Sequence, residues 1–270
     1  MTTTTLKLRE AALVSDRRLR PMMGVPVWEA LPAREVPYSF SDPFILLHEA
    51  TLHPSQMADM DTEHPHRGFD NLWYILKGSS STGHTTGPGG AVERADLPEG
   101  SFLFLRTGRG AVHAEKIGAD QLSAGIDEEV RTVLFWVNLA RNGKAAEPFA
   151  RVVRREEMAQ GREGDAMIRV LVGRDTPVQL GTPGLILDVE LPEGGRAEHK
   201  VPAEFQGFAY VLDGAASFGA NHARAEAGQL ALMGPGDRLV AEDAVRGTRY
   251  LLMAGRPYGE TPRFNGPYVD

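Results

Sequence analysis

Short apolar segments bounded by glycine or proline recur along the whole chain. They are rich in Val, Ile, Leu, Phe and Tyr, which favour β-strands, and turn residues separate them at intervals of roughly ten residues or more. The predicted strands are residues 44–52, 71–78, 101–108, 131–140, 166–173, 185–192, 208–214, 229–236 and 248–255. One segment, residues 155–160, predicts a short helix. The pattern as a whole predicts an all-β fold, as a sandwich or a barrel.

A coarse internal repeat divides the chain into two halves. The first half contains NLWYILKGSSSTG and then LPEGSFLFLRTG, and the second contains GFAYVLDGAASFG and then AEAGQLALMGPGD. In both halves a strand ends in Tyr-x-Leu-x-Gly, and a polar return leads to a second strand punctuated by glycine. The segment between them is charged and rich in small residues. We therefore predict two domains, residues 1–144 and 145–270.

Charge and composition narrow the classes of partner. The 270 residues carry a formal net charge of −7, and the pI is about 5.7. This balance argues against broad electrostatic binding to nucleic acid or to an anionic membrane surface. The chain has no cysteine, which excludes a disulfide framework, a thiolate metal site and a cysteine nucleophile.

The N-terminal sequence MTTTTLKLRE lacks the apolar core of a signal peptide. No run of about eighteen or more apolar residues predicts a transmembrane helix. Together with the missing cysteines, these features lead us to expect a cytoplasmic protein that is not inserted in a membrane.

The segment HPHRGFD, residues 64–70, contains two of the eight histidines. In an extended segment, side chains two residues apart point to the same face, so His64 and His66 project together. Two neutral imidazoles on one face chelate divalent metals well. Since an isolated His-x-His is more often a surface pair or a packing motif, the spacing alone does not establish a metal site.

A second segment, TGRGAVHAEKIG at residues 107–118, carries His113 and Glu115 with the same spacing. Three imidazoles and one carboxylate suit an open octahedral site that keeps positions for water or substrate. Such a site supports redox or Lewis-acid chemistry, whereas closed structural zinc sites more often use thiolates. The residues alone leave Fe, Mn, Co, Ni, Cu and Zn as alternatives.

At this point the chain resembles a known family, the pirins of the cupin superfamily. The resemblance is carried by SDPFILLHEA, HPHRGFD, TGRGAVHAE, LFWVNLA and GRPYGETPRFNGPYV, which spread over nearly the whole chain. It implies two tandem cupin domains, each a jelly-roll-like β-barrel. It also implies one metal, usually iron, held in the N-terminal domain by His64, His66, His113 and Glu115, and a metal-free C-terminal domain.

One residue departs from the family pattern. Pirins usually read His-Arg-Gly-Phe-Glu, and this chain has Asp70 at the last position. We interpret Asp70 as a structural residue near the metal rather than a ligand.

The resemblance leads to two functional hypotheses. The first is a quercetin 2,3-dioxygenase-like enzyme that opens the ring of a flavonol with O₂, with Fe(II) as the expected metal and Glu115 as both ligand and proton acceptor. The second is an iron-dependent, redox-sensitive co-regulator that binds a transcription factor or a metabolic enzyme. A site that binds metal without a present role is a third alternative. The sequence cannot separate them.

Other polar residues receive structural interpretations. We expect Arg67 and Arg109 to anchor loops through carboxylate or carbonyl groups, and residues 78–90 to form a flexible hairpin loop. The remaining histidines are interpreted as surface or hydrogen-bonded core residues: His48, His53, His84, His199 and His222.

Overall fold

The computed structural model describes residues 7–22, 24–56, 63–85, 93–117 and 122–270, and for residues 115–117 only the backbone. Strands make up most of the described residues, and the helical elements among them include the short helix α1 (Tyr38–Ser41) and two 3₁₀ turns, η1 (Pro54–Gln56) and η2 (Arg155–Glu157). The predicted all-β fold is confirmed. No helix in the described part of the chain is long and apolar enough to span a bilayer.

The chain forms two compact units, and neither is continuous in sequence. The first unit consists of Arg18–Pro32, Phe44–Glu157 and Glu260–Asp270. The second unit consists of the N-terminal segment through Arg17, Ala33–Pro43 and Met158–Gly259. The expected boundary between residues 144 and 145 differs from this division, because the strand at Phe149–Val153 pairs with Phe102–Arg106 and so stays in the first unit.

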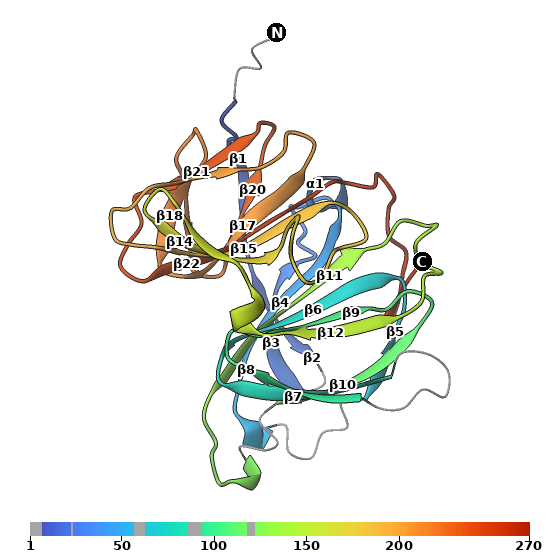
Figure 1. Ribbon diagram of the computed structural model, residues 1–270. Helices are drawn as coiled ribbons and strands as arrows, with labels where there is room; N and C mark the ends of the chain where they lie inside the picture. Colours follow the sequence, from blue (N-terminus) through green and yellow to red (C-terminus); the bar gives the residue numbers. More distant parts are fainter. Residues whose placement is uncertain (1–6, 23, 57–62, 86–92, 118–121) are drawn as a thin grey trace. The chain divides into compact units, whose positions relative to one another are not determined.

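The first unit is built from a seven-stranded and a four-stranded antiparallel sheet (Figure 1). In hydrogen-bonded order, the larger sheet consists of β12 (Phe149–Val153), β9 (Phe102–Arg106), β6 (Phe69–Lys77), β11 (Val130–Asn138), β4 (Phe44–Leu52), β3 (Val25–Leu31) and β2 (Arg18–Met22). The smaller sheet consists of β5 (His64–His66), β10 (Ala111–Ile117), β7 (Ser79–Thr85) and β8 (Glu93–Pro98). A two-stranded hairpin, β23 (Phe264–Asn265) and β24 (Tyr268–Val269), completes this unit.

The second unit repeats the plan with one sheet of seven strands and one of four. The larger sheet consists of β1 (Ala11–Asp16), β20 (Gln229–Met233), β17 (Gln206–Asp213), β22 (Thr248–Gly255), β15 (Gly184–Leu191), β14 (Ala166–Val172) and β13 (Gln160–Glu163). The smaller sheet consists of β16 (Ala197–Lys200), β21 (Arg238–Glu242), β18 (Ala215–Phe218) and β19 (Ala223–Glu226).

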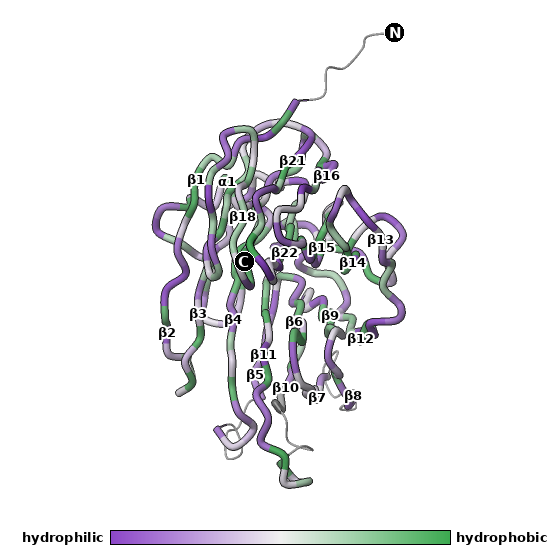
Figure 2. Tube along the Cα trace, turned by 90° about the vertical axis from the view of Figure 1, so that its left-hand side faces the viewer, coloured by the Kyte–Doolittle hydropathy of each residue, from purple (hydrophilic) through white to green (hydrophobic). Residues whose placement is uncertain are grey.

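Each unit encloses a hydrophobic core between its two sheets. In the first unit, Trp73, Ile75 and Leu103 of the larger sheet pack with Leu97 and Ala111 of the smaller one. Figure 2 shows the alternation of hydrophilic and hydrophobic residues along the strands that such two-sided sheets require. This face-to-face packing is the cupin barrel that the resemblance predicts.

The predicted strands all appear, within a few residues at their ends. The predicted helix at residues 155–160 is only the 3₁₀ turn η2, followed by β13. The predicted loop at residues 78–90 is wrong for its first part, because Ser79–Thr85 form strand β7 between β10 and β8; residues 86–90 lie outside the described residues. The strands that no predicted segment covers are β1, β2, β3, β5, β7, β8, β10, β12, β13, β16, β18, β19, β21, β23 and β24.

Candidate metal centre

Two neighbouring strands bring three histidines together. β5 pairs antiparallel with β10, so that His64 lies opposite His113 and His66 lies opposite Ala111. His64 and His66 therefore share a face with His113. The ring centroids of the three imidazoles are 4.6 Å (64–66), 4.5 Å (64–113) and 4.9 Å (66–113) apart. The three histidines of the predicted ligand set meet at one place.

The ring nitrogens are placed for a shared ion. Each of the three side chains offers one nitrogen, and these nitrogens all lie within 4.8 Å of one another. Nε2 of His113 is 3.0 Å from Nε2 of His64. His66 and His113 are buried, and His64 is partly buried. Converging imidazoles in a site shielded from water fit a divalent transition metal.

The buried rings are neutral at physiological pH. Burial, followed by the neighbouring His64, lowers the pKa of His66 to about 3. Burial also lowers the pKa of His113 well below its ordinary value, and His66 and His64 add to that effect. A neutral imidazole keeps a lone pair on one nitrogen, which is the form that binds a metal.

A backbone carbonyl fixes the orientation of His66. Nδ1 of His66 lies 3.2 Å from the carbonyl oxygen of Pro267. A carbonyl only accepts hydrogen bonds, so Nδ1 carries the proton and donates. The lone pair of the neutral ring is then on Nε2, the arrangement found for metal-ligating histidines.

Two aromatic rings cover the inner side of this cluster. The ring centroid of His66 lies 5.1 Å from those of Phe69 and Trp136, and Phe69 stacks on Trp136 at 4.0 Å. Phe69 is fully buried and Trp136 nearly so. These rings keep water away from one side of the imidazoles.

Glu115, the fourth predicted ligand, is described only by its backbone. It lies on β10 two residues after His113, opposite Thr82 of β7. Strand geometry therefore places it on the face that carries His113. Its side chain lies outside the described residues, so its part in the site stays a prediction.

Asp70 belongs to an ion pair instead. Its two carboxylate oxygens accept hydrogen bonds of 2.8 and 2.9 Å from Nε and Nη2 of Arg106, its cross-strand neighbour on β9. The Asp70 side chain is fully buried, and it is not among the described groups whose donor atoms could share a metal. This bidentate pairing agrees with the structural role expected for Asp70.

A pocket of about 380 Å³ opens beside His66. Its volume falls within the range of roughly 300–1,000 Å³ usual for small-molecule sites. Its lining comes from β5 and the residue after it, the end of β7, the turn before β10, β10 itself and the C-terminal hairpin: Pro65, His66, Arg67, Thr85, Arg109, Gly110, Ala111, Val112 and Tyr268. A ligand in this pocket would lie against one edge of the imidazole cluster.

The two arginines of the pocket have carboxylate partners, as expected for anchoring residues. Arg67 donates to both carboxylate oxygens of Asp270, at 2.8 and 3.1 Å. Arg109 lies 2.7 Å from Glu147 in an exposed pair. The Arg67 pair connects the residue that follows β5 to the C-terminal hairpin.

The other histidines lie outside this cluster. His48 binds Glu29, His53 binds the carbonyl of Asp127, His199 lies between Glu163 and Tyr250, and His222 pairs with Glu242. His84 lies opposite His113 on β7, 3.6 Å from Glu93, and burial lowers its pKa. An exposed group of His222, Glu242 and Asp243 also has donor atoms within 4.8 Å.

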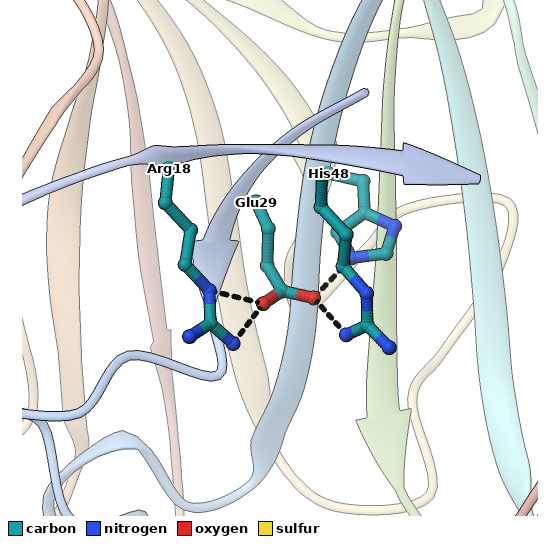
Figure 3. A network of polar contacts seen from close by, with 4 residues as sticks. Arg18, Glu29 and His48 are labelled. Atoms are coloured by element: carbon teal, nitrogen blue, oxygen red, sulfur yellow. Dashed lines mark hydrogen bonds and ion pairs between the residues drawn. The ribbon is translucent and has the colours of Figure 1, made fainter. Parts of the chain in front are cut away.

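A buried polar cluster around Glu29 was not anticipated. Figure 3 shows its carboxylate between Arg18 and His48; Nε of Arg18 donates at 2.7 Å, and Nη1 of Arg20 donates at 2.7 Å. Nε2 of His48 lies 3.1 Å from the same carboxylate. The sequence feature that could have indicated this cluster is the position of Glu29, a charged residue within the otherwise apolar segment VPVWEAL.

Comparisons with known proteins agree with this fold. The family model described as the pirin C-terminal cupin domain matches residues 186–270. A pirin-like protein of Arabidopsis thaliana is 30% identical over 265 residues, which cover 94% of this chain and 81% of the relative.

Two solved structures share the fold. A quercetin 2,3-dioxygenase from Acinetobacter baumannii superposes with a TM-score of 0.83 at 20% identity, covering 97% of this chain and 92% of that protein. The bacterial pirin YhhW from Escherichia coli, solved in complex with nickel(II), gives a TM-score of 0.65 at 16% identity, covering 94% of this chain and all of that protein (100%). These two similarities assign the fold, and the relative from Arabidopsis assigns the family. The chain belongs to the pirin family.

Proposed function

We propose that the first unit binds one divalent metal through His64, His66, His113 and Glu115, and that the loaded protein is a dioxygenase that opens the ring of quercetin or a related flavonol. The observation that carries the proposal is the cluster of three imidazoles, two of them neutral and buried, beside an open pocket. The nickel(II) bound by the similar pirin YhhW supports the metal. The fold shared with a quercetin 2,3-dioxygenase supports the reaction. We expect Fe(II) as the metal, with Mn, Co, Ni, Cu or Zn as alternatives.

When bound, the metal would supply Lewis acidity toward the 3-hydroxyl of the flavonol and redox chemistry toward O₂. The residues of the protein would bind the substrate, exclude water and accept a proton. Tyr268 and Val112 give the pocket apolar surface against which an aromatic ring can pack. Phe69 and Trp136 shield the inner side of His66 from water. Glu115 is the proposed acceptor of the hydroxyl proton. Both atoms of O₂ enter the products, a ring-opened ester and carbon monoxide.

Metal analysis and oxygen uptake test the proposal together. Protein purified without added metal should contain one metal per chain, and it should consume O₂ and release a ring-cleaved product when given flavonols. His64→Ala and Glu115→Ala should lose both properties, whereas His53→Ala, which alters a histidine outside the cluster, should keep both. Full metal content in the first two variants would overturn the ligand assignment. A metal-loaded protein that neither consumes O₂ nor cleaves any flavonol would overturn the dioxygenase and favour the co-regulator.

A further inference from the structure

The last residues of the chain return to the metal centre. We call Glu260–Asp270 the C-terminal strap; it is part of the first unit. Its hairpin is closed by β23 and β24 and by two backbone hydrogen bonds of 2.9 Å between Arg263 and Asp270. The strap therefore has a defined conformation of its own. It contains GPYV, the end of the motif GRPYGETPRFNGPYV, to which the resemblance assigned no role.

The strap is bonded to the segment that follows His66. Tyr268 forms a parallel bridge with Arg67, and the amide of Val269 donates to the carbonyl of Arg67 at 2.9 Å. Gly68 has a φ of +93°, and a Cβ there would lie 1.8 Å from the carbonyl oxygen of Val269. Only glycine allows the two backbones to approach this closely.

Side chains add two more anchors. Nζ of Lys144 donates to the carbonyls of Gly68 (2.9 Å) and Val269 (3.1 Å) and thus joins the two segments. Arg67 binds the carboxylate of Asp270 and lies 5.0 Å from the ring centroid of Tyr268. Val269 is fully buried. The strap is therefore held against β5 by backbone bonds, charge and burial together.

This position gives the strap two contacts with the candidate site. The carbonyl of Pro267 accepts the Nδ1 hydrogen bond of His66, and Tyr268 forms one wall of the pocket. We propose that the strap is a working part of the metal centre: Pro267 holds His66 in the Nδ1–H tautomer, so that Nε2 binds the metal, and Tyr268 positions the substrate. The inference rests on the proposed metal site.

The tautomer can be measured without metal. Histidine ¹⁵N NMR of the metal-free protein should show His66 with Nδ1 protonated and Nε2 unprotonated, assigned by comparison with His66→Gln. In Arg67→Ala/Lys144→Ala, which removes both side-chain anchors, the Nε2–H tautomer of His66 should become populated. Phe264→Ala, an exposed position of the same strap, is the control and should match the wild type. A folded anchor variant that keeps the wild-type tautomer would overturn the positioning role.

Cobalt(II) titration tests the consequence for the metal. Loss of a partner that orients a ligand typically lowers metal affinity by about 10–100-fold. We expect a loss in that range, with an altered d–d spectrum, for the anchor variant and for a variant that ends after Gly266. Tyr268→Ala should leave Co(II) affinity unchanged and raise KM for the flavonol more than it changes kcat.

Two results are decisive. Wild-type affinity and spectrum in both strap variants would overturn the inference and leave the proposed function intact. No Co(II) binding by the wild type would remove the metal site and this inference with it. A variant ending after Gly266 that fails to fold leaves the full-length anchor variant as the test.

Discussion

The two units have the same strand order, but they carry different side chains at the positions that correspond to the imidazole cluster of the first unit. When the strand orders of the two units are aligned, β6 corresponds to β17, β7 to β18, and β10 to β21. Gly78 directly precedes β7, and Gly214 directly precedes β18, so these two glycines occupy equivalent positions. From them, the strand registers give the equivalent residues on β10 and β21, and then those on β5 and at the end of β16. The matched pairs are His64 and His199, His66 and Val201, His113 and Leu239, and Glu115 and Ala241. One imidazole of three survives in the second unit.

The surviving imidazole of the second unit has no nitrogen left for a metal. Nδ1 of His199 binds Glu163, and its Nε2 lies 2.6 Å from the hydroxyl of Tyr250. Both His199 and Tyr250 are fully buried, and burial raises the pKa of Tyr250 well above its ordinary value. In the first unit, by contrast, the ring centroid of each of the three imidazoles lies within 4.9 Å of the other two. The same scaffold thus holds either a set of convergent donors or a closed hydrogen-bond chain.

A buried ion pair is common to both units. Glu49 on β4 accepts a hydrogen bond of 2.8 Å from Nε of Arg131 on β11. At the matched positions, Asp188 on β15 accepts one of 2.8 Å from Nε of Arg249 on β22. This pair links the same two strands in both barrels, so it belongs to the scaffold rather than to the site.

The two units also differ between strands β3 and β4 of the first unit. There Glu29 on β3 lies directly opposite His48 on β4. The matched positions between β14 and β15 are Val170 and Leu187. The first unit therefore carries a charged interior cluster where the second unit is apolar. The two barrels diverge in polarity at two places, and only one of these is the candidate metal centre.

The largest effect, on metal binding, is expected when His113 of the first unit is replaced by leucine, the residue at the matched position of the second unit. His113→Leu should reduce bound metal to background and lower Co(II) affinity by more than about 100-fold, because even loss of an outer partner costs roughly 10–100-fold. Elemental analysis and Co(II) titration measure it. His53→Leu, in the same unit, should bind like the wild type. Full metal content in His113→Leu would show that the two barrels do not differ as described.

Removing the shared ion pair should destabilise both units by similar amounts. Glu49→Gln and Asp188→Asn should each lower the free energy of unfolding by roughly 2–4 kcal/mol, because each weakens a nearly buried pair. This expected loss of stability is smaller than that for a fully buried ion pair, because the side chains of Arg131 and Arg249 are 20% and 22% exposed. Urea unfolding measures it, with Glu129→Gln of an exposed pair as a control expected to cost under about 1 kcal/mol. A loss in one unit alone would contradict a common scaffold role.

Acid should weaken the first unit through Glu29. Burial alone would raise the pKa of Glu29, but hydrogen bonds from His48, Arg18 and Arg20 outweigh it and lower the pKa to about 2. Because the folded pKa is depressed, the contribution is present above about pH 4.5 and is lost as the pH falls toward about 2. Glu29→Gln should lower the free energy of unfolding by about 2–3 kcal/mol at pH 7, and the difference should shrink with acid. A difference that stays constant from pH 7 to pH 3 would contradict this assignment.

The smallest effect is expected from adding one histidine to the second unit. Leu239→His places an imidazole opposite His199, yet metal per chain should not rise, since His199 is engaged at both nitrogens and Val201 and Ala241 offer no donor. Elemental analysis checks it. A second bound metal would show that His199 can leave its partners, and that the two barrels are closer in function than their side chains indicate.

Much of the site followed from local sequence. His64, His66 and His113 could be grouped because strand alternation fixes which side chains share a face, and each spacing is visible within a few residues. The repeat around Gly78 and Gly214 likewise revealed two copies of one plan. The anchoring role of Arg67 was also predicted, although its partner Asp270 was not.

The remaining features depend on contacts between distant parts of the chain. Nothing local in residues 11–16 indicates pairing with residues 229–233, since edge pairing is decided by the completed sheet. The partner of His66 is the carbonyl of Pro267, and every residue has a carbonyl, so no residue type could signal it. Glu29 left a trace as a charge within an apolar strand, but its three partners come from two other strands.

The pairing of β1 with β20 has a consequence for biosynthesis. β1 is translated well before β20, with which it pairs along Ala11 to Asp16. Until β20 has been translated, the backbone donors and acceptors of β1 form an open strand edge, which is a template for pairing with other chains. Most of the first unit, by contrast, has emerged once residue 157 is translated. The larger sheet of the first unit can therefore form before that of the second, and β1 is open to misassembly until β20 has been translated.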